Sequence, residues 1–193
     1  MEQRPGSDHG TPSHRAYVVA AVVEAVSFLE AIINEVLTDA ADGTSGALDD
    51  LDTAARARLG RYAKSGANRR TPTLTTYATA LDLANSRPLD PGTVVSQDAH
   101  LLVKLRNELV HPRPVTFDRL TKLEQGLAAR FAINPLWPAG STGAFLAALL
   151  GSPCARWAAS TAHAYATEWA NRLGLERLPY RRVTLTPAPE NLM

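Results

Sequence analysis

Apolar side chains recur every three or four residues between about His14 and Ala40, and this period constrains the fold more than any other feature. The residues that share it are Val18, Val22, Val26, Leu29, Ile33 and Leu37. A repeat near 3.6 residues places them on one side of a long helix, whose apolar face needs partners to cover it. Because Glu24, Ser27 and Glu30 interrupt the run, we expect a core helix rather than a membrane span.

The rest of the chain repeats the helical period between glycine and proline breaks, without the alternation that predicts strands. The expected helices cover residues 47–65, 74–85, 94 or 96 to 110, 117–131, a brief stretch at 144–150, and 152–173. On the last of these, the aromatic side chains recur at helical spacing and are expected in the core or at a helix-packing interface. The pattern therefore predicts an all-α fold in the form of a helical bundle.

Length and composition favour one domain. At 193 residues and 45% hydrophobic content, the chain can bury a single core. We expect a disordered leader at 1–13, a single helical bundle domain at 14–173 and an extended, basic, proline-containing tail at 174–193. The net charge of +1 indicates neither a nucleic-acid partner nor binding to a membrane surface. The lone Cys154 excludes an internal disulfide and favours a cytoplasmic location, and the arginine-rich, alanine-rich usage is typical of bacteria.

The segment Arg106-Asn107-Glu108-Leu109-Val110-His111 carries the sharpest chemical content, at the end of the helix expected over 94–110. Leu109 and Val110 are assigned to its buried face. Asn107 and His111 are four residues apart and therefore stack on one face. Arg106 is about 140° from His111 around an ideal helix. Since a long guanidinium can reach across a turn, we expect Arg106, Asn107 and His111 to converge on one small ligand group.

This arrangement resembles the signature of the HEPN domain family, in which an Arg and an adjacent polar residue precede a His by four to six intervening residues. Arg106, Asn107 and His111 fill those positions. The resemblance covers about residues 14–131 and implies an antiparallel helical bundle, here with an additional C-terminal helix. Glu30 and Asn34 of the first helix stand where such domains often offer supporting polar residues toward the same cleft.

The resemblance implies metal-independent RNA cleavage without a cofactor. A histidine such as His111 can act as general acid or base, because the imidazole titrates near neutrality. A planar Arg106 can clamp the phosphate with two donors, and Asn107 would orient the His or donate to the phosphate. The products would be a 2′,3′-cyclic phosphate and a 5′-hydroxyl. With one such His per chain, the resemblance also implies a homodimer whose two signatures share a cleft, a design suited to a toxin or a phage-defence effector.

Three further arginines, Arg69, Arg70 and Arg113, are candidates for holding an RNA backbone, although scattered arginines are usually solvated surface. Arg113 also occupies the position at which one subgroup of the family carries a Tyr that a partner enzyme modifies. A toxin silenced by that modification is therefore not supported. Arg156 and His163 repeat the spacing of the signature, but a Trp follows Arg156 where the family has a small polar residue.

Two other interpretations stay open. The chain is then either a non-catalytic HEPN-like module that binds a nucleotide, RNA or a protein such as an antitoxin, or a structural subunit whose aromatic last helix docks on another protein. In the structural interpretation Arg106 pairs with Glu30 or Glu108, and His111 only caps its helix. An Arg106/His111 pair that lines a basic cleft favours catalysis, and a buried, salt-bridged Arg106 favours the structural interpretation. The sequence contains no phosphate-binding glycine loop, no recognisable Ser-His-Asp frame and no metal-ligand cluster.

Overall fold

The computed structural model describes residues 12–44, 48–111, 117–131 and 149–176, and within these ranges the chain is all-helical, as the period predicts. The elements are α1 (Pro12–Asp42), α2 (Thr53–Lys64), the short 3-10 helix η1 (Ala67–Arg70), α3 (Thr73–Leu83), α4 (Val94–Val110), α5 (Phe117–Ala128) and α7 (Ser152–Leu173). Residues 1–11 of the leader expected at 1–13, most of the tail and the stretch 144–148 lie outside the described residues. Pro12 and Ser13, which were expected in the leader, belong to α1.

Local capping explains where the helices begin. The expected start of α2 at residue 47 is wrong, because Leu48–Leu51 forms a turn and Asp52 caps the helix by accepting a hydrogen bond from the Ala55 amide at 3.0 Å. Thr93 caps α4 in the same way, so α4 begins at Val94 and ends at Val110, as expected. The segment expected as a loop before α3 contains η1.

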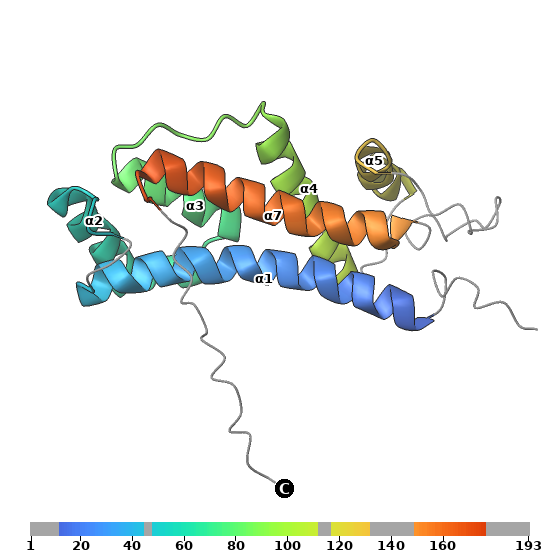
Figure 1. The fold of residues 1–193 in the computed structure, drawn as a ribbon, viewed down its shortest axis with the longest axis horizontal. Helices are drawn as coiled ribbons and strands as arrows, with labels where there is room; N and C mark the ends of the chain where they lie inside the picture. Colours follow the sequence, from blue (N-terminus) through green and yellow to red (C-terminus); the bar gives the residue numbers. More distant parts are fainter. Residues whose placement is uncertain (1–11, 45–47, 112–116, 132–148, 177–193) are drawn as a thin grey trace, which may run out of the picture.

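The two longest helices, α1 and α7, lie side by side with their N-terminal ends together (Figure 1). Nε2 of His14 at the start of α1 lies 3.3 Å from Oγ of Ser152 at the start of α7. This pair is therefore parallel, and the expected antiparallel arrangement does not hold for it. Between α1 and α7 the chain passes through α2, α3, α4 and α5 and comes back toward the end at which α1 begins, so α7 can run parallel to α1.

α1 supplies the centre of the core. Val22, Val26 and Leu29 have no exposed surface, and α1 packs against α2, α3, α4 and α7. Residues 14–42 are also long and apolar enough to cross a membrane, but this criterion is weak because the core helix of a soluble protein meets it too. Since its apolar face is covered by the other helices, we interpret α1 as a core helix.

An aromatic cluster joins α1, α3 and α7. The Tyr77 hydroxyl donates to the Leu29 carbonyl at 2.8 Å, and Trp169 Nε1 donates to the Tyr77 carbonyl at 3.0 Å. The Tyr77 ring meets those of Trp169 and Tyr165 edge to face, at centroid separations of 4.8 and 5.4 Å. The expectation that Tyr165 and Trp169 belong to the core is confirmed.

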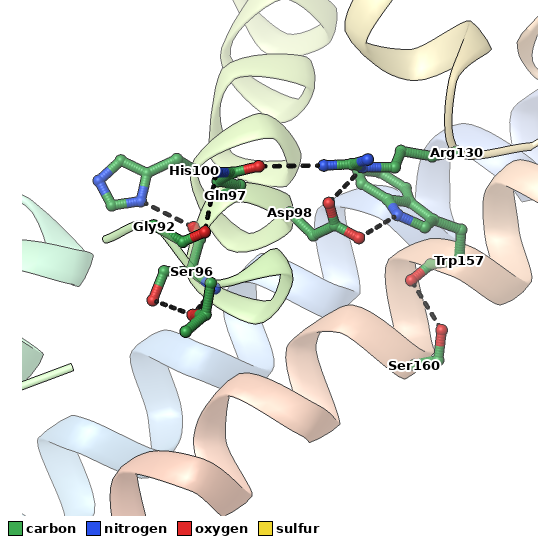
Figure 2. Close-up of polar contacts among 9 residues, drawn as sticks. Gly92, Ser96, Gln97, Asp98, His100, Arg130, Trp157 and Ser160 are labelled. Atoms are coloured by element: carbon green, nitrogen blue, oxygen red, sulfur yellow. Dashed lines mark hydrogen bonds and ion pairs between the residues drawn. The ribbon is translucent and has the colours of Figure 1, made fainter. Parts of the chain in front are cut away.

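A second polar cluster fixes the first half of α4 (Figure 2). Asp98 of α4 accepts from Nε of Arg130, at the end of α5, and from Nε1 of Trp157 on α7 at 3.2 Å. Arg130 also donates to Gln97 at 3.4 Å, and the Trp157 ring lies against Phe131. The Asp98 carboxylate thus links α4 to the end of α5 and to α7. These contacts help to fix the orientation of α4, whose C-terminal end carries Arg106, Asn107 and His111.

Gly60 allows α2 to approach α1 closely. A Cβ at this position would lie 2.5 Å from the Ala40 carbonyl oxygen, and backbone cannot move away cheaply. We expect Gly60→Ala to lower the free energy of unfolding by about 1–3 kcal/mol, measured by urea denaturation. Gly126→Ala is the matched control, since its Cβ would meet only the movable side chain of Leu101, with Cδ1 at 3.1 Å. Equal stabilities for the two variants would contradict the close approach.

Three buried acidic groups make the fold sensitive to alkaline pH. Burial raises the pKa of the Cys154 thiol to about 12, raises that of Tyr165 to about 12, and raises the pKa of Tyr77 well above its ordinary value. Above the ordinary values of 9.0 for Cys and 10.0 for Tyr, the unfolded chain loses protons that the native state retains. Stability is therefore present below pH 9.0 and falls as pH rises toward 12.

We expect urea denaturation to show this fall above about pH 9, with a limiting slope near 1.4 kcal/mol per pH unit for each group that titrates. Cys154→Ala is expected to lower stability below about pH 9, through lost packing, and to make the alkaline slope shallower. An unchanged slope in that variant would show that Cys154 does not contribute.

Candidate functional site

The signature arginine is held by the first helix. Arg106 Nη2 donates to Glu30 Oε1 at 2.6 Å, which joins residues 76 positions apart on α4 and α1. Thr73 Oγ1, at the start of α3, donates to the same oxygen at 3.2 Å. Glu30 therefore gathers three helices at one point, and two residues that the sequence predicted for one site are in contact.

The Arg106–Glu30 pair is the contact that the structural interpretation predicts for Arg106. The side chains are 22% and 42% exposed, respectively, so solvent screens the pair and its contribution to stability is about 0.2–1 kcal/mol. Its geometric effect is larger, because the carboxylate fixes the direction of the guanidinium. A guanidinium has five N–H groups, so this hydrogen bond does not exhaust the donors of Arg106.

Asn107 and His111 lie at the exposed end of α4. Both side chains are exposed, and His111 terminates the helix with φ −125° and ψ 65°. The His111 amide donates to the Asn107 carbonyl at 2.9 Å, which closes the last turn through the backbone alone. Val110, expected in the core, is 44% exposed, whereas its neighbour Leu109 is partly buried and packs against the core. Within one chain Arg106 thus contacts α1, while Asn107 and His111 are open to solvent.

A cavity of about 400 Å³ opens beside Glu30. Glu30, Ile33 and Asn34 of α1 line one side, and Asn68 and Arg69 of η1 line another. The remaining wall consists of three threonines at the start of α3, Thr71, Thr73 and Thr76.

The cavity brings Glu30 and Asn34, which the sequence analysis expected as supporting residues, together with Arg69, which it expected to hold an RNA backbone. Arg70 is exposed and does not line it, and Arg113 lies outside the described residues. Arg156 and His163, which repeat the spacing, are exposed on α7.

Asn68 and the three threonines were missed by the sequence analysis, which assigned 66–73 to a loop carrying two arginines. The available signal was the density of amide and hydroxyl side chains around those arginines, in a segment too short for a core helix. Arg106 pairs with Glu30, and Arg69 at the rim of the cavity has no carboxylate partner among the described residues, so the guanidinium of Arg69 adds a positive charge there.

Comparison of the chain with protein-family models, with curated proteins and with solved structures found no match. Within the described ranges, the structure contains no group of three or more His, Cys, Asp or Glu side chains that could hold a metal ion.

Proposed function

We propose that this protein is a HEPN-type, metal-independent endoribonuclease. The observation that supports the proposal most is that the signature arginine and the supporting residue expected on the first helix lie at one point, with Arg106 only partly buried and therefore within reach of a substrate. His111 lies at the end of the same helix with its side chain exposed, where a substrate can reach it. A HEPN-like bundle with one additional C-terminal helix accommodates this arrangement.

Each group has a chemical role in this proposal. His111 takes the proton from a ribose 2′-hydroxyl or returns one to the leaving 5′-oxygen. Arg106, oriented by Glu30, donates its remaining N–H groups to the nonbridging oxygens, on which negative charge develops during attack. Asn107, one turn before His111, donates to the phosphate or orients the imidazole. The 2′-oxygen bonds to phosphorus as the 5′-oxygen leaves, which forms a 2′,3′-cyclic phosphate and a 5′-hydroxyl.

The proposal includes a homodimer, because one His per chain provides a single acid or base where the reaction uses both. A two-fold axis near the ends of the α4 helices would place two His111 side chains in one cleft. Sedimentation analysis is expected to show a dimer at micromolar concentration. A monomer under those conditions would contradict the composite site.

We expect purified protein to cleave RNA equally well in EDTA and in Mg²⁺, because no step of the proposed chemistry uses a metal. The measurement is gel analysis of a labelled oligoribonucleotide, with the cyclic phosphate end identified by mass. A matched preparation of the Arg106→Ala variant detects contaminating nuclease. Activity that disappears in EDTA and returns with Mg²⁺ would replace this mechanism with a metal-dependent one.

The second candidate function is binding of RNA, a nucleotide or a protein such as an antitoxin, without cleavage. The Arg106–Glu30 pair itself favours it, since a guanidinium already paired with a carboxylate attracts a phosphate less strongly. The same oligoribonucleotide separates the two functions. Saturable binding measured by fluorescence anisotropy, with intact RNA after prolonged incubation, would favour the binding module.

A further inference from the structure

The three threonines that line the cavity beside Glu30 present hydrogen-bond acceptors to it. Thr73 Oγ1 donates a hydrogen bond to Glu30 Oε1. Thr71 Oγ1 donates one to the Ala67 carbonyl at 2.9 Å and accepts one from the Tyr62 hydroxyl at 3.4 Å. Thr76 Oγ1 likewise donates to the Pro72 carbonyl at 3.3 Å. A hydroxyl whose proton is already used can offer only its lone pairs to a ligand. The threonine wall therefore fits a molecule that carries several O–H or N–H groups.

Asn68 offers a further hydrogen-bond acceptor to the cavity. It lines the cavity, and its Oδ1 is buried without a hydrogen-bond partner among the described residues. A buried acceptor left unpaired costs about 1–3 kcal/mol. A ligand that donates a hydrogen bond to Asn68 Oδ1 would remove that cost. The cavity therefore favours a ligand with a hydroxyl or amino group at this position.

The rim of the cavity has the opposite preference. Arg69 is exposed and lines the rim, and Glu30 is neutralised by Arg106. The side chains around the opening therefore carry a net positive charge, which favours an anionic group such as phosphate. An α-helix also begins here, and its N-cap Pro72 supplies no side-chain acceptor for the first amide groups of α3.

We propose that this cavity binds one ribonucleotide unit, with the sugar hydroxyls or base amino groups on the Asn68 and threonine side and the phosphate at Arg69. The volume of about 400 Å³ lies within the usual range for small-molecule sites. The choice of a ribonucleotide rests on the proposed action on RNA, and the unit is either a free nucleotide or one nucleotide of a bound strand. In the latter case the cavity positions RNA next to Arg106.

Isothermal titration calorimetry tests the assignment with the four ribonucleoside 5′-monophosphates, their 2′-deoxy counterparts, inorganic phosphate and a short oligoribonucleotide. We expect saturable binding of a ribonucleotide or of the oligoribonucleotide, at least about threefold tighter than the deoxy form, because the 2′-hydroxyl is one of the donors. Binding of the mononucleotide identifies a free nucleotide as sufficient, and binding of the oligomer alone identifies a strand.

Arg69→Gln is expected to weaken this binding about tenfold or more, because it removes a charge-assisted hydrogen bond. Asn68→Ala is a second variant that removes the buried acceptor, and Arg156→Gln on α7 is the matched control for an exposed arginine, with no change expected. The assignment is overturned if neither the ribonucleotides nor the oligoribonucleotide bind, or if inorganic phosphate binds as tightly as the nucleotide. It is also overturned if the Arg69→Gln and Asn68→Ala variants bind like the unmodified chain.

RNA cleavage is measured on the same preparations, so that failure of this assignment and failure of the proposed function can be told apart. Ribonucleotide binding that depends on Arg69, without any cleavage, supports the cavity assignment and contradicts the nuclease. Cleavage without such binding does the reverse.

Discussion

Replacement of His111 by alanine is expected to lower RNA cleavage by about 10² to 10⁴, the usual contribution of a positioned proton-transfer group. The stability of the fold should change little. The His111 side chain is exposed, and the backbone amide that closes the last turn of α4 is retained in the variant. Loss of the favourable dipole interaction of a cation at the helix end would cost at most about 0.3–2 kcal/mol.

The measurement is a cleavage time course on total RNA beside thermal melts and sedimentation of the same samples. His163→Ala is the matched control, because that histidine is also exposed and belongs to the Arg/His pair of similar spacing on α7. If His111→Ala, His163→Ala and the unmodified chain cleave RNA identically, His111 is only a helix-end residue.

Arg106→Lys is the companion test for the phosphate clamp. Lysine keeps the charge and can still pair with Glu30, but it lacks the planar arrangement of two donors. We therefore expect near-normal melts and strongly reduced cleavage. Normal cleavage in this variant would show that Arg106 acts only through its ion pair with Glu30.

The largest expected effect on stability belongs to Trp169. This side chain has no exposed surface, packs edge to face on Tyr77 and donates to the Tyr77 carbonyl. Trp169→Ala is expected to lower the free energy of unfolding by about 3–5 kcal/mol, through the cavity it leaves and the loss of the hydrogen bond to the Tyr77 carbonyl.

Urea denaturation followed by circular dichroism measures this loss, and Tyr17→Ala is the control because Tyr17 is 76% exposed. The consequence should extend to the site. Tyr77 belongs to α3, whose first turn carries Thr73 and Thr76 of the cavity wall. A loss below about 1 kcal/mol for Trp169→Ala would mean that the core repacks around the missing ring and that α3 is held by other contacts.

Local regularities in the sequence determined the helical class and most helix positions. The period of Val22, Val26 and Leu29 required one buried face, and glycine and proline breaks separated the expected helices. These signals are readable because they depend on neighbours within one or two turns. The signature was recognisable for the same reason, since Arg106, Asn107 and His111 lie within six consecutive positions.

Contacts between distant segments were decided only by the tertiary structure. The sequence left Glu30 and Glu108 as alternative partners for Arg106, and packing of α4 on α1 selected Glu30 across 76 positions. It also could not show that η1 and the start of α3 close a cavity against α1, because Asn68 and the threonines carry no periodic signal. Helical spacing specifies which residues share a face, whereas the partner of that face depends on how all the helices pack at once.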